Sequence, residues 1–440
     1  MAKYKAYPEY KDSGVEWLGD IPAHWNIKRL GQLFEERREK VSDKEYPALS
    51  VTMQGIVPQL GTAAKTEAGD NRKLVLKDDF VINSRSDRKG SAGVSLLNGS
   101  VSLISIVMRP KNINPKFAHH LLRSCPFQEE FYRYGKGIVA DLWSTNSSEM
   151  KNILLPEIQF SESEKISNFL DHETAKIDSL IEKQQQLIEL LKEKRQAVIS
   201  HAVTKGINPD APMNDSGVEW LGAIPRNWNC VAIKNICKIV NGSTPKSSIE
   251  EYWDGDIDWF TPTDLSHKET IQINDSLRKI TNSGFLSCGT TMVPANTVIL
   301  SSRAPIGSLA ITKKSACTNQ GCKSLVTFSA QLSKYIYYSL LTFNSPLNNL
   351  GRGSTFLELS TDDLGGFKIS LPNDDMGEII KYIDITILKI DNLIEKQLQQ
   401  IELLKERRTA LISAAVTGKI DVRHWHAPDE QITGEAEAVV

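Results

Sequence analysis

The amino-acid sequence predicts an α+β protein with two tandem β-rich domains, each followed by one long helix. The two helices are expected to pair as an antiparallel coiled coil with pseudo-twofold symmetry. Three observations predict this fold: an internal repeat, a helical apolar periodicity at the end of each repeat, and short β-branched runs between turn residues.

The repeat has two parts, a lead-in rich in tryptophan and a helix. Residues 12–26, DSGVEWLGDIPAHWN, agree with residues 215–229 at 12 of 15 positions, and residues 176–204 agree with residues 389–417 at 22 of 29. Because both parts recur in the same order, the chain is a tandem duplication with a divergent block inside each copy. The expected domains are 1–155, 156–208, 209–371 and 372–422, with a polar acidic tail at 423–440.

Apolar residues in the repeated helix recur at alternating steps of four and three, which is typical of a coiled-coil seam. The expected seam residues are Ile181, Gln184, Ile188, Leu191, Ile394, Gln397, Ile401 and Leu404. Capping boxes are expected at the helix starts, Ser161 with Glu164 and Asp375 with Glu378. Gly206 and Gly418 follow the helix ends, where a left-handed residue is favoured.

The position of the second block between the two helices predicts their direction. The termini of a compact domain often lie close together, so the block at 209–371 can return the chain antiparallel to the first helix. About 40 residues at about 1.5 Å each give a rod of about 60 Å that would hold the two blocks apart as a ruler. The alternative is that the seam serves only for dimerisation or packing.

The two divergent blocks keep a few common anchors. Residues 81–85, VINSR, resemble residues 298–303, VILSSR, and the loop 135–137, GKG, aligns with 351–353, GRG. Short runs such as Val101–Val107, between Gly, Asn and Pro turns, indicate strands. A common scaffold with different surfaces is therefore expected.

Composition and charge exclude several classes of protein. There is no apolar run of about 18 residues to span a membrane and no apolar segment near the N-terminus to direct export, so a cytoplasmic protein of a bacterium or archaeon is expected. The six cysteines form no metal-binding spacing and are expected to be reduced thiols. The net charge is only −2, yet residues 20–155 carry 20 basic and 15 acidic side chains.

The sequence contains none of the common catalytic motifs. There is no phosphate-binding loop, no dinucleotide-binding glycine motif, no H-E-x-x-H zinc motif and no G-x-S-x-G nucleophile turn. The eight histidines form no ligand set. We therefore expect no catalysis, no metal and no cofactor bound by this chain.

Polar loops in the divergent blocks supply candidate DNA contacts, since Arg reads guanine edges, Asn and Gln read adenine edges, and Lys, Ser and Thr bind phosphates. In the first block they are Arg85, Arg88, Lys89, Lys136 and Asn146. In the second block they are Thr261, Thr263, Asp264, Arg303, Asn319, Gln320 and Arg352. The alternative is that each is an ordinary solvated surface residue.

The lead-in tryptophans, which are Trp17, Trp25, Trp220 and Trp228, could stack on bases, but packing onto helix ends or binding a partner is favoured for them. Trp143 in the divergent ADLWSTNSS is the better surface candidate.

The whole chain resembles the specificity subunit of type I restriction–modification enzymes. The residues that carry the resemblance are the duplicated DSGVEWLG-x-IP-x-x-W, the duplicated KID-x-LIEKQ…IELLKE-x-R…IS-x-AVT, and NGSTPKSSIEEYWDGDIDWFTPTDL, TNQG and GRGSTF in the second block. The first block, with GTAAKTEAGDNRKLVLKDDF, lacks the GSTP-type opening, so no contact residue transfers to it by motif.

The resemblance implies that each block is a target recognition domain for one half of a split, asymmetric sequence in double-stranded DNA. It implies that the helices set the half-site spacing and dock two modification (methyltransferase) subunits. Those subunits would carry S-adenosylmethionine and methylate adenine, and two restriction subunits would add ATP and Mg²⁺-dependent translocation and cleavage. This chain would be a non-catalytic part of a host-defence system. The alternatives are a self-contained nuclease or methyltransferase, and a coiled-coil scaffold that binds only proteins.

Overall fold

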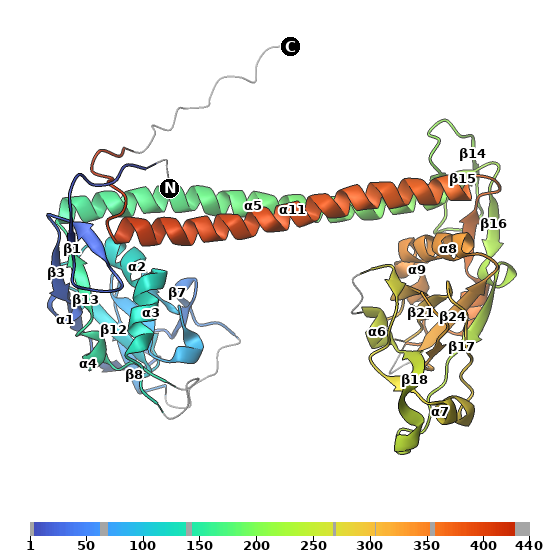
Figure 1. Ribbon diagram of the computed structural model, residues 1–440, viewed down its shortest axis with the longest axis horizontal. Helices are drawn as coiled ribbons and strands as arrows, with labels where there is room; N and C mark the ends of the chain where they lie inside the picture. Colours follow the sequence, from blue (N-terminus) through green and yellow to red (C-terminus); the bar gives the residue numbers. More distant parts are fainter. Residues whose placement is uncertain are drawn as a thin grey trace, which may run out of the picture. The chain divides into compact units, whose positions relative to one another are not determined.

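The computed structural model describes residues 4–61, 69–137, 143–266, 270–303, 305–352 and 357–426 (Figure 1). The chain divides into two compact units, the first built from residues 1–184 and 398–440 and the second from residues 185–397. The division runs through the two long helices, α5 (Phe160–Lys205) and α11 (Met376–Val416), so each helix contributes to both units. Residues 427–440 of the expected acidic tail and 353–356 of GRGSTF lie outside the described residues.

The first unit contains an antiparallel four-stranded sheet in the order β10-β9-β12-β4. Its strands are β4 (Phe34–Glu36), β9 (Phe80–Asn83), β10 (Ala92–Val94) and β12 (Ser105–Pro110). A three-stranded sheet adds β5 (Lys40–Val41), β8 (Arg72–Val75) and β11 (Gly99–Val101). Two-stranded pairs are β1 (Tyr10–Asp12) with β2 (Asp20–Pro22), β3 (Asn26–Arg29) with β13 (Leu154–Glu157), and β6 (Leu49–Thr52) with β7 (Gly55–Pro58). The short helices are α1 (Leu30–Leu33), α2 (Pro115–Arg123), α3 (Cys125–Arg133) and α4 (Ser147–Met150).

The second unit contains a five-stranded sheet in the order β17-β24-β21-β22-β19. Its strands are β17 (Cys237–Asn241), β19 (Gln272–Ile273), β21 (Val298–Ser301), β22 (Leu309–Thr312) and β24 (Cys322–Thr327). A smaller sheet joins β18 (Trp253–Phe260), β20 (Lys279–Ile280) and β23 (Cys317–Thr318), and the pairs are β14 (Met213–Asp215) with β15 (Ala223–Pro225) and β16 (Asn229–Ala232) with β25 (Lys368–Leu371). The short helices are α6 (Pro262–Ser266), α7 (Asn282–Ser287), α8 (Ala330–Thr342), α9 (Asn344–Asn349) and α10 (Thr361–Gly366).

The two main sheets have one strand order in common. The order β4-β12-β9-β10 in the first unit corresponds to β17-β24-β21-β22 in the second, with antiparallel pairing throughout. The anchors that the sequence analysis aligned, residues 81–83 and 298–301, lie in the matching strands β9 and β21. The expected α+β class, with two β-rich domains on a common scaffold, is confirmed.

The N-terminus of α5 differs from the prediction. The helix begins at Phe160, and the amides of Glu162 and Ser163 donate to the Gln159 carbonyl at 3.1 and 2.9 Å. Ser161 therefore lies inside the first turn, and the expected capping box of Ser161 with Glu164 is wrong. The helix α11 begins at Met376, directly after Asp375, which is the position that the sequence predicted.

Both long helices end at a glycine in the left-handed conformation, as the sequence predicted. Gly206 has φ of 76° and Gly418 has φ of 75°. A Cβ added to Gly418 would lie 2.3 Å from Pro22 Cδ, and one added to Gly206 would lie 3.2 Å from a ring carbon of Trp228. Each lead-in therefore covers one helix end at a distance that only glycine permits.

The helices run antiparallel within each unit. In the first unit, Phe169 lies against Trp425, which follows α11, while Asp178 further along α5 pairs with Arg408 at 2.9 Å. In the second unit, Arg195 pairs with Asp391 at 3.0 Å. Asp178 and Asp391 occupy the same position of the repeat, as do Arg195 and Arg408, so each unit joins the aspartate of one copy to the arginine of the other.

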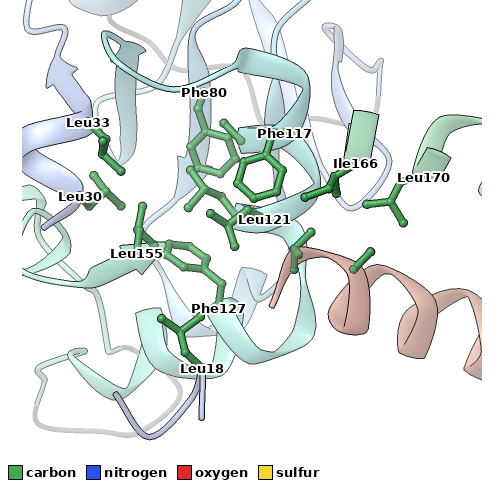
Figure 2. Packing of buried hydrophobic residues seen from close by; sticks show 14 of the residues in the cluster. Leu18, Leu30, Leu33, Phe80, Phe117, Leu121, Phe127, Leu155, Ile166 and Leu170 are labelled. Atoms are coloured by element: carbon green, nitrogen blue, oxygen red, sulfur yellow. The ribbon is translucent and has the colours of Figure 1, made fainter. Parts of the chain in front are cut away.

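A continuous apolar core fixes α5 to the β-rich part of the first unit (Figure 2). The core contains Phe80 of β9, Phe117 of α2, Phe127 of α3 and Leu155 of β13, together with Ile166 and Leu170 of α5. Burial of each such side chain contributes about 1.5–3 kcal/mol. The orientation of the first-unit surface relative to its helix segments is thereby set. Among the described residues, no helix has the length and apolar character needed to cross a bilayer.

We expect Gly418→Ala to destabilise the protein more than Gly14→Ala. Both glycines have positive φ, but a Cβ at Gly14 meets open space, whereas one at Gly418 meets Pro22 and Trp25. The left-handed conformation should cost each variant about 1–2 kcal/mol, and the overlap should cost Gly418→Ala about 1–3 kcal/mol more. Urea unfolding measures both, and equal losses would contradict the role of the lead-in in covering the helix end.

Candidate nucleic-acid interface

In the first unit, two of the predicted basic residues are brought together by the backbone. Arg85 lies two residues after the end of β9 and forms a β-bridge with Ser144. Lys136 forms a second bridge with the same residue through hydrogen bonds of 3.1 and 3.2 Å. The amide of Ser86 also donates to the Trp143 carbonyl at 2.8 Å. The strand end and the Gly-Lys-Gly loop, which are far apart in the sequence, therefore form one basic surface.

The second unit repeats this arrangement with different residues. Arg303 follows β21 and bridges Glu358, and Arg352 bridges Glu358 through hydrogen bonds of 3.0 and 2.9 Å. Arg303 corresponds to Arg85, and Arg352 corresponds to Lys136. The residue between the two cations changes from a neutral serine to a carboxylate, so the same backbone presents two different electrostatic patterns.

The cationic side chains at these surfaces form weak, exposed ion pairs. Lys136 contacts Glu149 at 2.7 Å, Arg303 contacts Glu358 at 3.2 Å, and Arg352 contacts Asp363 at 2.9 Å. Lys89 pairs with Glu129, and Arg88 lies 3.7 Å from Asp87. Exposed pairs contribute only about 0–1 kcal/mol each, so these cations can exchange their carboxylates for phosphates at little cost.

Lys323 is a cation of the second surface that the sequence analysis missed. It lies in β24 and is only 8% exposed. Burial lowers the pKa of Lys323, the Glu358 carboxylate raises it, and Arg303 lowers it. Lys323 pairs with Leu300 of β21, near the strand end that leads to Arg303. A lysine inside a short strand with the sequence CKSLVT was the available signal.

The polar loops of the second unit lie beside Arg303. The amide of Ser302 donates to the Gly321 carbonyl at 2.8 Å, and the amide of Asn319 donates to the Phe260 carbonyl at 2.9 Å, next to Thr261. The Gln320 side chain accepts a hydrogen bond from the Thr244 hydroxyl. Thr263 is exposed on α6. The predicted contacts of this block, apart from Asp264, thus gather around one strand end.

Two predicted DNA contacts have structural roles, one of them at a buried position. Asp264 is 6% exposed, and its carboxylate accepts hydrogen bonds from the Thr261 amide and the Leu277 amide, both at 2.7 Å. The Asn146 side chain caps α4 by accepting from the Glu149 amide at 2.9 Å. These oxygens satisfy backbone donors. A short polar side chain that faces inward cannot be told from a surface one by residue type, which is why the prediction for Asp264 was wrong. Asn146 is exposed, and its role as a DNA contact stays a prediction.

Two of the four lead-in tryptophans, Trp25 and Trp228, are corrected as partner contacts, and for Trp17 and Trp220 that role stays a prediction. Trp25 is fully buried and Trp228 is 7% exposed, so a partner cannot reach them. Trp220 stacks on Phe367 with ring centroids 4.9 Å apart, and Trp17 lies edge-on to Phe127 at 6.1 Å. These two rings remain half-buried. Trp143 keeps an exposed ring beside the first basic surface.

The seam residues differ in burial from their neighbours on the helices. Between residues 182 and 197, and between 391 and 410, the buried or half-buried positions are those of the expected seam together with Arg195 and Arg408. Ile188 and Ile401 are the most buried among them. Ile181 and Leu404 pack against the core of the first unit.

The described residues provide no evident catalytic group. No three His, Cys, Asp or Glu side chains among them are placed to hold a metal ion. Burial raises the pKa of the Cys237 thiol to about 12 and that of Cys317 to about 11. Such thiols are protonated at neutral pH and are poor nucleophiles. The arrangement is suited to binding.

Comparison with known proteins supports a DNA-related class. Residues 225–403 match the family model of the type I restriction modification DNA specificity domain. The chain is 38% identical over 189 residues to the MjaIX specificity subunit of Methanocaldococcus jannaschii, which covers 42% of this chain and 43% of that protein. It thus spans less than half the length of that relative.

Two further matches extend over most of the chain. The putative MjaX specificity subunit of the same organism is 23% identical over 433 residues, covering 92% of this chain and 96% of the relative. A chain from a solved structure on complex assembly and conformational transition of the type I R-M system has a TM-score of 0.70 at 17% identity, covering 91% of this chain and 99% of that one. The latter shows likeness of fold.

The two units have the same scaffold and each carries a basic surface, but the polar side chains differ between the two surfaces. This arrangement defines a recognition protein. The matches identify the family that the sequence resembles. The chain is similar to the specificity subunits of type I restriction enzymes, and residues 225–403 match the model of their DNA specificity domain.

We expect Asp264→Ala to lower the free energy of unfolding by about 2–4 kcal/mol, because it leaves the buried Thr261 and Leu277 amides without their acceptor. Thr263→Ala, one residue away and exposed, should change stability by less than about 0.5 kcal/mol. Chemical denaturation measures both. A stable Asp264→Ala variant with altered DNA binding would restore the original assignment.

Proposed function

We propose that this protein is the DNA sequence-specificity subunit of a type I restriction–modification complex. Each β-rich domain binds one half-site of a bipartite, asymmetric target in double-stranded DNA. The observation that carries the proposal is the repeated basic bridge, Arg85 with Lys136 in one unit and Arg303 with Arg352 in the other, on one scaffold with different polar neighbours. Cations that recur in both units suit a common phosphate backbone, and polar groups that differ between the units suit different bases.

The surface residues divide by their chemistry. Lys89 and Lys136 supply charge toward phosphates, while Arg303 and Arg352 can also reach guanine edges in the major groove. Gln320 is exposed beside them and presents an amide that suits adenine. The net charge of −2 leaves much of the phosphate neutralisation to partner subunits.

Partner docking uses the long helices in this proposal. Leu180 and Leu403 are exposed in the first unit, and Leu190 and Leu393 are exposed in the second. Leu180 and Leu393 occupy one position of the repeat, and Leu190 and Leu403 occupy another. Each unit therefore carries the same pair of exposed leucines, which suits two copies of one modification subunit. The sequence analysis chose the repeated tryptophans as partner contacts and did not consider the repeated leucines outside the seam.

The chemistry belongs to the partner subunits. The modification subunits supply S-adenosylmethionine for adenine methylation, and two restriction subunits supply the ATP and Mg²⁺-dependent steps. This chain selects the DNA and positions the partners without a bond-making step. The helices α5 and α11 run unbroken for 46 and 41 residues, which suits them to setting the half-site spacing as a stiff element.

Mapping modified bases in the source genome, with the gene intact, deleted and restored, tests the proposal. Deletion should abolish one two-part adenine-methylated motif, and restoration should return it. Exchange of residues 20–155 for those of a relative should change one half of the motif and leave the other intact. A two-part motif that persists after deletion would contradict the proposal, and a partner complex without any sequence preference would favour a protein scaffold.

We expect the double variant Leu180→Ser, Leu403→Ser to weaken binding of the modification subunit by about 10-fold or more, since two apolar contacts are lost. The matched control is Leu277→Ser with Leu286→Ser, which also removes two exposed leucines but lies in the β-rich part of the second unit. Calorimetry with the purified modification subunit measures both. Equal affinities for the two variants would place docking elsewhere.

A further inference from the structure

The first unit contains a hollow of about 550 Å³ next to the predicted basic loop. It is lined by the β6–β7 hairpin and the residue after it, the end of β9, the loop at residues 86–89, and residues 101–105. Arg88 and Lys89, which the sequence analysis selected, lie on its wall. The hollow thus connects the basic loop that carries Arg88 and Lys89 with the β6–β7 hairpin and residues 101–105, which no motif had indicated.

The lining is cationic and hydroxylic. The charged residues of the lining are three cations, Arg72, Arg88 and Lys89, and one carboxylate, Asp87. Several serine and threonine hydroxyls complete the wall. Arg72 is only 5% exposed and donates to the Ser100 hydroxyl at 2.9 Å and to the Ser100 carbonyl at 3.0 Å. A positive wall with hydroxyl groups suits a phosphodiester backbone.

The edge of the hollow is apolar and open to solvent. Met53, Leu60 and Ile104 are exposed large side chains that lie along it. Apolar side chains beside polar readers are suited to the methyl group of thymine or to a base face. Solvent exposure of three such residues in one place needs a ligand that is partly apolar, as a nucleobase is.

Two amide side chains line the hollow, Gln59 and Asn83. The Gln59 backbone is held by a hydrogen bond from its amide to the Ala48 carbonyl at 3.1 Å, while its side chain is exposed. The Asn83 Oδ1 accepts from the Arg85 amide at 3.1 Å, which orients its Nδ2 as a donor. Both amides are therefore held on ordered backbone, as base readers must be.

The second unit has no counterpart to Asn83. The equivalent last residue of the central strand is Ser301, which is fully buried and whose hydroxyl donates to the Pro305 carbonyl at 2.7 Å and accepts from the Ser308 amide at 2.8 Å. The amide is thus particular to the first unit, as expected for a group that distinguishes one half-site from the other.

We propose that Gln59 and Asn83 are base-reading, specificity-determining residues of the first half-site, with Arg88 and Lys89 on the adjoining phosphates. The proposal rests on the proposed function and deepens it for the domain in which no motif assigns contacts. Gln59 presents both a donor and an acceptor and reads adenine, whereas Asn83 donates to an acceptor on a neighbouring base edge.

Methylome maps of cells that carry single variants of the full chain in the complete complex test this assignment. Gln59→Ala should relax one position of the first half-site, with about 10-fold or greater loss of preference there, and leave the second half-site unchanged. Asn83→Ser, which copies the second unit, should relax a neighbouring position. Arg88→Ala and Lys89→Ala should lower methylation at all sites without changing the motif.

Gln54→Ala is the matched control, because Gln54 is an exposed amide in the same hairpin that does not line the hollow. It should methylate the wild-type motif fully. Wild-type motif and extent for both Gln59→Ala and Asn83→Ser would overturn the assignment while leaving the proposed function intact. Absence of a two-part motif for the wild-type chain would instead remove the proposed function itself. Melting curves of the variants exclude unfolding as the cause of any loss.

Discussion

A left-handed glycine beneath a lead-in residue ends each long helix, and the arrangement of both units depends on that contact. Gly418 lies under Pro22 and Trp25, and Gly206 lies under Trp228, so close that a methyl group could not be inserted without displacement. The contact at Gly206 fixes where the chain leaves α5 and where the second β-rich domain begins. Because Trp25 belongs to the first lead-in and Gly418 to the end of the second helix, the contact also ties the two ends of the chain into one unit. Pairs of aspartate and arginine then set the antiparallel register, with one such pair in each unit.

On this repeated frame, function rests on small differences at equivalent positions. The strand ends after β9 and β21 carry arginine in both units, and each meets a basic loop through a third residue. That third residue is Ser144 in one unit and Glu358 in the other, and the last residue of the strand is a half-buried asparagine in one and a buried serine in the other. Backbone hydrogen bonds are indifferent to these changes, so the scaffold can stay constant while the surface chemistry changes. The proposed reading of two different half-sites requires this separation.

The accuracy of the sequence-based predictions followed the kind of physical signal available. Gly206 and Gly418 could be predicted because a left-handed residue at a helix end favours glycine for local steric reasons. The strands at 81–83 and 298–301 could be predicted because β-branched apolar runs have a local preference. The capping box at Ser161 failed because α5 begins earlier, at Phe160, and Glu162 instead accepts hydrogen bonds from Tyr7 and Trp25, which are distant in the sequence. Asp264 failed because a polar side chain near a turn can face solvent or satisfy buried amides, and residue type does not distinguish the two.

The sequence by itself determined the duplication, the α+β class, the periodicity of the two helices and the family that the chain resembles, because these depend on local spacing and on comparison of the chain with itself. Only the tertiary structure decided that Trp25 and Trp228 are internal. It also decided that Arg85 and Lys136 bridge the same residue, as do Arg303 and Arg352. The same holds for the hollow that Gln59, Asn83 and Arg88 line. These facts depend on strand pairing between segments far apart in the chain. Such pairing is selected by the free energy of the whole core, so no single segment encodes it.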